Sequence, residues 1–367
     1  MPKTLLLTPD FPPRRGGVAR YLEAVAMAIK EDVRVVAAPE PDAGRFDAQA
    51  PFPIERAPLL YPLFWPRWLK TVRIMVERAP SYRRLIVSHV VPFGTAALLA
   101  GLKTKIPYVV IAHGMDVALA SRNPWKKFLA GLVFRNAELV IANSRALKDE
   151  IRGRFGASCV AFVHPALTLK GAVKEWDTAP IAHPGVRLLT VSRLVARKGH
   201  LRVLEALHRL RERGELPADL SYTVVGDGPM SEAIERRAVD LGVDDIVHFH
   251  HGVTDERLPE LYRSHDVFVM PTAAKGADRE GFGIVYLEAG AYGLPCVATM
   301  QPGVDEAVLD GTTGVLVPDG DIEALARAIR RLALDADVRK TLGEAGRRRA
   351  QEEFSRARQA EKLRHLL

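Results

Sequence analysis

Short apolar runs alternate with longer amphipathic stretches along the first half of the chain. KTLLLTP at residues 3–9, for example, is followed by GVARYLEAVAMAIK at residues 17–30, in which the apolar positions have helical spacing. Apolar strands separated by amphipathic helices are typical of a parallel sheet that is covered on both faces. The pattern predicts a doubly wound α/β domain over residues 1–175.

The same alternation begins again after a linker-like segment at residues 171–185. VRLLTVSRL opens a second series of strands and helices, and a chain of this length is expected to form two domains. We predict a second doubly wound domain over residues 185–345, and a C-terminal helix over residues 346–367 that packs back on the first domain.

The composition is that of a globular protein. The chain is 48% hydrophobic and 26% charged, and its apolar runs are far shorter than the ~20 residues of a membrane-spanning helix. Its first residues enter a strand without the pattern of a signal peptide, so we expect a cytoplasmic protein. The two cysteines, Cys159 and Cys296, lie in different predicted domains, which argues against a disulfide framework or a cysteine metal site.

The net charge of +8 is concentrated in the first half of the chain. Residues 1–180 hold 26 Lys and Arg against 15 Asp and Glu. Nucleic acid, an anionic membrane and phosphorylated ligands are all compatible with this charge. Because no helix-turn-helix, zinc-finger or RNP-like pattern is present, a nucleic-acid-binding protein is the less favoured alternative.

Two loops that follow predicted strands suit a phosphate. Gly16 and Gly17 stand at the start of a helix, where backbone N–H groups favour an anion, although a plain turn is the alternative. Arg193 and Lys198, in VSRLVARKGH, lie five residues apart in a loop after the first strand of the second domain. Two such cations suit a diphosphate, and a solvated basic loop is the alternative.

Polar residues also follow other predicted strands. His113 ends YVVIAH, and Asn143 and Ser144 follow AELVIA. Asp227 lies in the glycine turn VVGDGP, where a structural role is the favoured interpretation. A lone histidine is more often structural, but the carboxyl end of a parallel strand is where ligands bind.

The stretch DREGFGIVYLEAGAYGLP contains two glutamates. Glu280 lies in the loop before a helix that we predict from Ile284 to Ala291, and Glu288 lies one turn inside that helix. The carboxylates are candidates for acid–base groups, metal ligands or hydroxyl acceptors, and surface charges are the alternative. The N–H groups at the helix start belong to Phe282, Gly283 and Ile284.

The chain resembles the retaining glycosyltransferases of family 4 on motifs that run through nearly its whole length. In order, these are RRGGVARY, AHG, ANS, VSRLVARKG, VVGDGP, REGFGIVYLEAGAYGLP and DGTTGVLVPDGD. The resemblance implies the GT-B fold, in which two Rossmann-like domains face a central cleft. It also implies transfer of a hexose from a nucleotide-sugar to an acceptor hydroxyl, with retained anomeric configuration and without a metal or other cofactor.

The resemblance assigns roles to the candidate residues. Arg193 and Lys198 would neutralise the donor diphosphate, Glu280 would hold hydroxyls of the transferred sugar, and Glu288 would hold the ribose. His113 would lie beside the reacting carbon. We expect same-face attack, since no carboxylate is placed as an obvious nucleophile. The other donor contacts implied are Gly16, Gly17, Phe282, Gly283 and Ile284, with Asn143, Ser144, Asp227 and Thr272 as weaker candidates.

The donor and the family pattern leave some points open. Val253 and Thr272 are the positions where the base would be sensed, and likeness to mannosyltransferases favours GDP-mannose over a UDP-sugar. The family's Gly-Gly-x-x-Glu loop is matched here only by Gly303 and Glu306. A GT-B-fold nucleotide-sugar epimerase is the alternative enzyme, against which the pair SRLVARKG and EGFGIVYLE argues.

Two basic, aromatic segments of the first domain are candidates for contact with an anionic membrane. Residues 56–84 hold seven basic residues and one acidic residue, and they also contain Trp65 and Trp68. Residues 121–135 again combine basic and aromatic residues. A helix of this kind can lie on a membrane, and a core-packing helix with a solvated basic face is the alternative. We expect a peripheral enzyme at the inner face of the cell membrane with a sugar or glycolipid acceptor, and leave its oligomeric state open.

Overall fold

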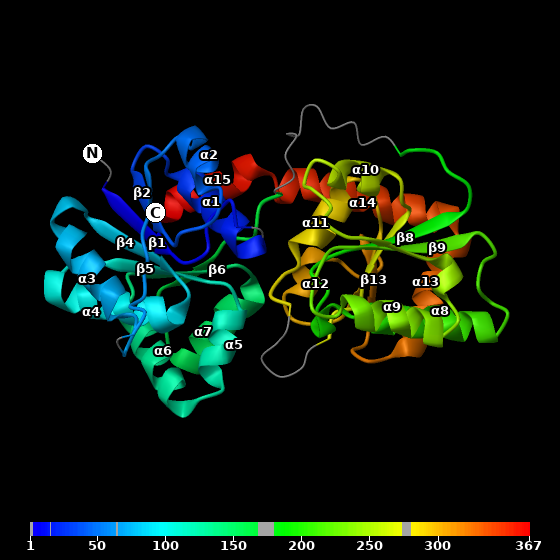
Figure 1. Cartoon of the computed structure of the whole chain (residues 1–367), viewed down its shortest axis with the longest axis horizontal. Helices are drawn as coiled ribbons and strands as arrows, with labels where there is room; N and C mark the ends of the chain where they lie inside the picture. Colours follow the sequence, from blue (N-terminus) through cyan, green and yellow to red (C-terminus); the bar gives the residue numbers. More distant parts are fainter. Residues whose placement is uncertain (1–2, 15, 64, 168–179, 274–279) are drawn as a thin grey trace. The chain divides into compact units, whose positions relative to one another are not determined.

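The computed structural model of the chain describes residues 3–14, 16–63, 65–167, 180–273 and 280–367. The chain divides into two compact units, which are coloured along the sequence in Figure 1. Unit 1 comprises Met1–Ala166 and Arg356–Leu367, and unit 2 comprises Leu167–Ser355. The chain therefore returns to unit 1 at Arg356, whereas the sequence pattern predicts this return at residue 346. The predicted boundary at residue 175 lies outside the described residues.

Unit 1 contains a parallel sheet of seven strands in the order β3-β2-β1-β4-β5-β6-β7. The strands are β1 (Thr4–Thr8), β2 (Val33–Ala37), β3 (Ile54–Arg56), β4 (Arg84–Ser88), β5 (Tyr108–Ala112), β6 (Leu139–Ala142) and β7 (Val160–Phe162). The helices are α1 (Gly17–Ala28), α2 (Ala43–Gln49), α3 (Leu69–Arg78), α4 (Thr95–Thr104), α5 (Met115–Ser121), α6 (Pro124–Asn136), α7 (Arg145–Phe155) and α15 (Arg356–Leu366).

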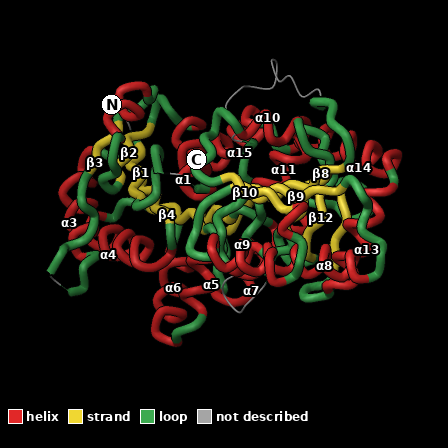
Figure 2. The backbone as a smooth tube through the Cα atoms, turned by 45° about the vertical axis from the view of Figure 1, so that its right-hand side comes forward, coloured by secondary structure: helices red, strands yellow, loops and turns green. Residues whose placement is uncertain are grey.

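Unit 2 contains a parallel sheet of six strands in the order β10-β9-β8-β11-β12-β13. The strands are β8 (Val186–Val191), β9 (Leu220–Val225), β10 (Val247–His250), β11 (Val267–Met270), β12 (Cys296–Thr299) and β13 (Gly314–Val317). The helices are α8 (His200–Glu212), α9 (Ser231–Asp240), α10 (Leu258–Arg263), α11 (Ile284–Ala291), α12 (Val304–Ala307), α13 (Ile322–Leu334) and α14 (Ala336–Glu353). Figure 2 shows α10 and α11 on one side of this sheet and α8 and α9 on the other.

The strands are apolar throughout because their side chains alternate between two buried layers. In β1, Leu5 and Leu7 enter one cluster, while Leu6 enters the other with Leu22 of α1. Leu363 of α15 joins this second cluster, which explains why the end of the chain belongs to unit 1. The predicted doubly wound α/β class is confirmed for both units.

Each sheet has one point at which its strand order reverses. This point lies between β1 and β4 in unit 1 and between β8 and β11 in unit 2. The connections that leave two such strands run to opposite faces of the sheet, and doubly wound proteins bind ligands at the crevice between them. The residues just after these four strands are therefore the first place to look for function.

Candidate active site

The reversal point of the unit 2 sheet brings together two cations and a carboxylate. The connection after β8 forms a 3₁₀ turn at Ala196–Lys198, and the connection after β11 carries Glu280. Lys198 Nζ donates to Glu280 Oε2 at 2.5 Å, and Arg197 Nη1 lies 3.4 Å from the same oxygen. The basic loop and the first glutamate of the motif thus form one group.

Glu280 is charged in spite of its burial. Its side chain is 14% exposed, and those of Lys198 and Arg197 are 11% and 17% exposed. Burial raises the pKa of Glu280, but the charges of Lys198 and Arg197 outweigh that effect and hold the pKa below its ordinary range. The group therefore brings two cations to one partly buried carboxylate, and cations at such a position favour an anionic ligand such as a phosphate.

Arg193 lies in the same loop, and its side chain is exposed. The loop is held through its backbone, since Leu194 N donates to Asp227 O at 2.9 Å. A Cβ on Gly226 would stand 1.9 Å from Ser192 O, so the close approach of these two loops requires glycine. The structure thus fixes the backbone of Arg193, and its contact with a diphosphate stays a prediction.

The two positions expected to sense the base lie at different strands. Val253 follows β10 and is half-buried, and its loop is held where Gly252 N donates to both carboxylate oxygens of Asp227, at 3.1 and 3.3 Å. Thr272 follows β11 and is fully buried, with Gln301 Nε2 bonded to its hydroxyl and its carbonyl. Both positions lie at the carboxyl edge of the sheet, but β9 and β8 separate their strands, so the two positions are not neighbours.

The helix predicted from Ile284 is confirmed as α11. Gly283 precedes it with a φ of +82°, and a Cβ there would stand 2.4 Å from the ring of Tyr286, so glycine is required. Phe282 is buried and packs against Phe354, with their ring centroids 5.8 Å apart. The loop is therefore anchored just before the helix start, whose first N–H groups have no intrahelical partner.

Glu288 lies within α11 and is 1% exposed. Tyr262 Oη donates to its Oε2 at 3.1 Å, and the Tyr262 ring stacks on Tyr292 at 5.3 Å between centroids. Burial and then the charge of Glu288 raise the pKa of Tyr292 to about 12, so this phenol stays protonated. The carboxylate is thus enclosed beside Tyr262 and Tyr292, and its contact with a ribose stays a prediction.

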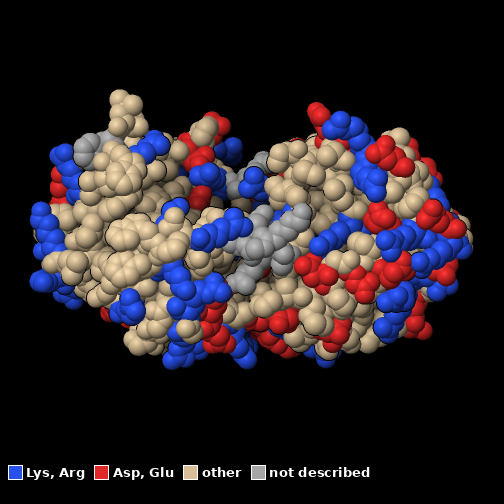
Figure 3. Space-filling model, turned by 90° about the horizontal axis from the view of Figure 1, so that it is seen from below, with Lys and Arg blue, Asp and Glu red and all other residues tan. Residues whose placement is uncertain are grey.

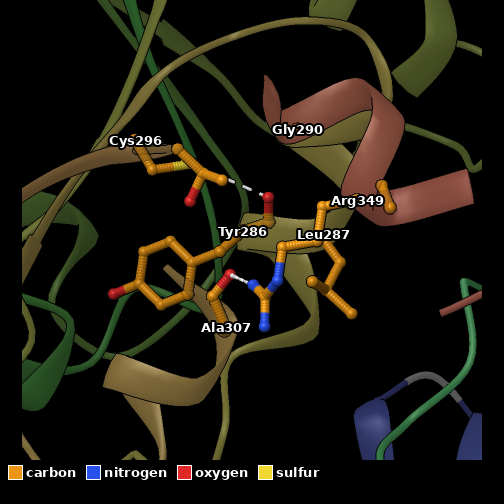
Figure 4. Close-up of a pocket in the computed structure, with 9 residues that line it drawn as sticks. Tyr286, Leu287, Gly290, Cys296, Ala307 and Arg349 are labelled. Carbon is orange, nitrogen blue, oxygen red and sulfur yellow. Dashed lines mark hydrogen bonds between the residues drawn. The ribbon is translucent and has the colours of Figure 1, made fainter. Parts of the chain in front are cut away.

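Helix α14 packs closely against α11. Figure 4 shows Gly290 of α11 beside α14, and Arg349 extending from α14 toward Ala307. A Cβ on Gly346 would stand 3.4 Å from the Cα of Gly290, so small residues let the two helices approach closely. Arg349 donates to the carbonyls of Ala307 at 3.0 Å and Glu306 at 2.7 Å. The stretch that departs from the family pattern is thereby tied to α14, which packs against the helix that carries Glu288.

The paired glycines of unit 1 stand where the sequence predicts. Gly16 and Gly17 are exposed at the start of α1, and Gly16 has a φ of +143°. Within the described ranges, no atom lies within 4 Å of a Cβ built on either glycine. The backbone at this helix start is therefore open, and its approach to a diphosphate or sugar stays a prediction.

His113 follows β5 and is held through its backbone and its ring. Its N–H donates to Asp116 Oδ1 at 3.0 Å, and its carbonyl accepts from Asn143 Nδ2 at 3.1 Å. The ring lies edge-on to Tyr21 and beside His89, at 5.8 and 5.3 Å between centroids. Burial and then the neighbouring His89 lower the pKa of His113 to about 3, so its ring is neutral at pH 7.

Sequence reasoning missed several polar residues of these groups. Arg197 is the second cation at Glu280, while Asp10 and His89, which follow β1 and β4, lie with Oδ2 and Nε2 3.3 Å apart. The rule that functional residues follow strands would have found Asp10 and His89. Ser144, by contrast, caps α7, since its hydroxyl accepts a backbone N–H of that helix at 3.2 Å.

Two family models match the chain, one in each unit. Residues 16–166 match the glycosyl transferase 4-like domain, and residues 178–349 match the glycosyl transferases group 1. The structure is similar to Anabaena HepE in complex with UDP and glucose, with a TM-score of 0.80, 20% identity and 99% of each chain covered. It is also similar to sucrose-phosphate synthase of Thermosynechococcus elongatus, with a TM-score of 0.82, 21% identity and 99% and 98% covered. The fold is therefore GT-B, and the class of protein is a glycosyltransferase.

Relatives in sequence narrow this class. A GDP-mannose-dependent alpha-(1-6)-phosphatidylinositol monomannoside mannosyltransferase of Mycolicibacterium smegmatis is 34% identical over 99% of this chain and 97% of its own length. A Corynebacterium glutamicum mannosyltransferase named for the monoacylated form of that acceptor is 28% identical over 100% and 97%. The chain belongs to glycosyltransferase family 4 and is a hexosyltransferase, which confirms the resemblance of its motifs.

Proposed function

We propose that this enzyme transfers mannose from GDP-mannose to a hydroxyl of a mannosylated glycolipid, with retained configuration and without a metal ion. The group of Arg197, Lys198 and Glu280 at the reversal point of unit 2 carries the proposal. Its cations suit a diphosphate, and its carboxylate suits the hydroxyls of a sugar. The names of the relatives support GDP-mannose and a phosphatidylinositol mannoside acceptor, with UDP-sugars as the next donors to test.

In the proposed reaction, the bond between the anomeric carbon and the β-phosphate oxygen breaks, and the acceptor oxygen attacks on the same face. The acceptor proton passes to the departing phosphate oxygen. Lys198 and the arginines of its loop stabilise the charge that develops on that phosphate, as preorganised donors do. Glu280 holds sugar hydroxyls, and Glu288 holds the ribose. His113, being neutral, adds no positive charge beside the electron-poor carbon.

A donor panel tests this proposal. The protein is incubated with phosphatidylinositol monomannoside and GDP-mannose, GDP-glucose or UDP-glucose, with and without excess EDTA. We expect transfer from GDP-mannose that EDTA does not reduce, and an α-linked product by NMR. Preference for the UDP-sugar would contradict the proposed donor, and a β-linked product would contradict retained configuration. Activity that EDTA abolishes and Mg²⁺ restores would contradict independence from a metal ion. Conversion of the donor sugar without acceptor would indicate an epimerase.

Of the two segments predicted to contact a membrane, residues 56–84 include α3, which packs one side on the core of unit 1. Met75 is fully buried, and Trp68 packs against the same apolar cluster. Arg73 and Arg78 form ion pairs with glutamates. The core-packing alternative therefore describes α3 better than a helix that lies on a membrane.

The segment of residues 121–135 is different, because its aromatic side chains face solvent. Trp125 and Phe128 of α6 are 65% and 52% exposed, and their rings stack at 5.8 Å. Lys126 and Lys127 between them are exposed. Helix α6 lies at the lower end of unit 1 in Figure 1, and Figure 3, viewed from below, shows Lys and Arg around an uncharged area of that unit. No helix in the described part of the chain is long and apolar enough to cross a bilayer.

We infer that the first turn of α6 touches an anionic membrane surface at which the glycolipid acceptor resides. Aromatic rings enter the interface, and each lysine near anionic lipid contributes ~1 kcal/mol. Co-sedimentation with phosphatidylglycerol vesicles at low salt tests this contact, with a Trp125→Ser, Phe128→Ser double variant. Leu102→Ser, at a side chain of α4 that is 59% exposed and lies outside both segments, is the matched control. Equal binding of wild type and double variant would contradict the contact, as would loss in the control alone.

A further inference from the structure

A chain of hydrogen bonds crosses the reversal point of the unit 1 sheet. The hydroxyls of Thr8, at the end of β1, and Ser88, at the end of β4, lie 2.7 Å apart. Ser88 Oγ lies 2.9 Å from Nδ1 of His89, and Nε2 of His89 lies 3.3 Å from Oδ2 of Asp10. Arg14 pairs with the other oxygen of Asp10 at 3.1 Å. These hydrogen bonds therefore link the loop after β1 to the loop after β4, and doubly wound sheets bind ligands between two such loops.

The chemistry of the groups determines which atom donates in the hydrogen bonds of His89. Because the carboxylate of Asp10 only accepts, Nε2 of His89 carries the hydrogen and donates it. In the neutral imidazole, Nδ1 of His89 then accepts from the hydroxyl of Ser88, and the hydroxyl of Thr8 lies beside both Ser88 Oγ and, at 3.1 Å, the carbonyl of Asp10. In this tautomer both ring nitrogens are bonded, so the imidazole holds the carboxylate of Asp10 in one place.

His89 and Asp10 are reachable from solvent, since their side chains are 24% and 23% exposed. The backbone of His89 has a φ of +69°, a left-handed conformation that residues other than glycine rarely adopt. The next residue, Val90, donates its N–H to Asp116 Oδ2 at 3.1 Å, which helps to hold this conformation. Strain of this kind persists where the surroundings impose it, and it concentrates at functional sites.

Two shielded polar atoms beside His89 need a partner. Nε2 of His113 and Oδ1 of Asn143 find no hydrogen-bond partner among the described residues. Buried polar atoms are almost always hydrogen-bonded in folded proteins. The rings of His113 and His89 lie 5.3 Å apart, and His89 contacts Asp10, so His89 is the neighbour of both residues. A polyhydroxyl compound, which both donates and accepts, satisfies all of these groups.

We propose that His89 is a positioning residue for the acceptor, and that it acts by holding the carboxylate of Asp10 where it accepts a hydrogen bond from an acceptor hydroxyl. Neighbouring hydroxyls of the same sugar or inositol ring bond to His113. This inference rests on the proposed glycosyl transfer, and it adds an acceptor-binding group in unit 1 to the donor group of unit 2.

Three variants of His89 separate its possible roles. His89→Gly removes the ring and suits the positive φ, while His89→Asn keeps a side chain there and retains a group at the position of Nδ1, next to Ser88. His89→Gln places its amide at the reach of Nε2, next to Asp10. Each is compared with the wild type for the KM of phosphatidylinositol monomannoside, the KM of GDP-mannose, and hydrolysis of GDP-mannose without acceptor.

We expect His89→Gly and His89→Asn to raise the acceptor KM at least about tenfold, as loss of a hydrogen bond to a charged group does. The donor KM and the hydrolysis rate should stay within about twofold of the wild type, and His89→Gln should recover most of the acceptor affinity. An unchanged acceptor KM, an equal rise in both KM values, or recovery by Asn and not by Gln would overturn the inference. If the glycine variant unfolds, the comparison of Asn with Gln decides.

The failure of this inference is distinguishable from the failure of the proposed function. If the wild type uses another donor, the proposed function is wrong, and the three variants are then compared with that donor. If the wild type transfers mannose but the variants bind acceptor normally, only the role of His89 is wrong.

Discussion

Glu280 offers the sharpest test of the donor group, because the structure gives it two cations in a partly buried setting. Glu280→Gln keeps the shape of the side chain and removes its charge. The side chains of Lys198 and Arg197, which are 11% and 17% exposed, then lose the negative charge of this carboxylate. Removal of one partner of a buried ion pair costs about 3–5 kcal/mol. We expect about 3 kcal/mol here, at the low end, since the group is not fully enclosed.

Thermal unfolding with and without GDP measures this effect. For a unit of this size, 1 kcal/mol shifts the melting temperature by about 2–4 °C, so the variant should melt about 6–12 °C below the wild type. A bound diphosphate supplies the missing negative charge, so saturating GDP should raise the melting temperature of the variant by more than that of the wild type. Transfer should fall sharply while GDP binds at least as tightly as it binds the wild type, because Glu280 is assigned to the sugar and not to the nucleotide.

The dependence on pH has a definite sign. Since Lys198 and Arg197 hold the pKa of Glu280 below its ordinary range against the effect of burial, the pair stabilises the fold above the ordinary glutamate range. This stability is lost as the pH falls through the folded pKa. The gap between the melting temperatures of wild type and variant should therefore be full at neutral pH and close in acid.

Glu323→Gln is the matched control in the same unit. Its carboxylate also contacts two arginines, Arg209 and Arg213, but it lies at the surface, so its loss should shift the melting temperature far less. The reasoning is refuted if GDP stabilises Glu280→Gln less than it stabilises the wild type. In that case the cations do not serve the diphosphate.

Three further outcomes are expected. Glu288→Gln should weaken GDP binding in isothermal titration more than it lowers turnover at saturating donor; equal, small effects of Glu288 and Glu280 variants would refute their division of labour. Lys198→Ala should lower kcat by about 10²–10³, as loss of a preorganised charge donor does. Arg193→Ala and Arg197→Ala are compared in the same assay, and the variant with the larger loss of kcat identifies the second cation at the leaving phosphate. Because the pKa of His113 is about 3, its ring signals in NMR should stay those of neutral imidazole down to about pH 4, and a midpoint near 6.5 would contradict its burial.

The alternation of apolar and amphipathic segments was sufficient to predict both sheets, because a parallel strand must be apolar on both faces. It also located α11 and the glycines at its start. The stripe on α3 was ambiguous for a physical reason: Trp68 and Met75 give the same periodicity whether they face a core or a membrane. Only the apolar cluster of unit 1 distinguishes the two.

The side chains of the site required information that spacing does not hold. Arg193 and Arg197 both precede Lys198, and the 3₁₀ turn at Ala196–Lys198 decides that Arg197 reaches Glu280. No residue pattern in the loop announces that turn. A sequence therefore supplies the set of cations, while the backbone conformation selects which of them share a carboxylate.

The strand order explains which residues far apart in the sequence come together. Asp10 and His89 are separated by 79 positions, and nothing in either stretch points to the other. Once β1 and β4 are neighbours at the reversal point, the residues after them must meet, as those after β8 and β11 do in unit 2. The two meeting points differ in chemistry: unit 2 presents an excess of positive charge, and unit 1 presents hydroxyls, a carboxylate and a neutral His113. A diphosphate is matched by the first and a polyhydroxyl ring by the second, which is the division of labour that a transferase with a charged donor and a sugar-like acceptor requires.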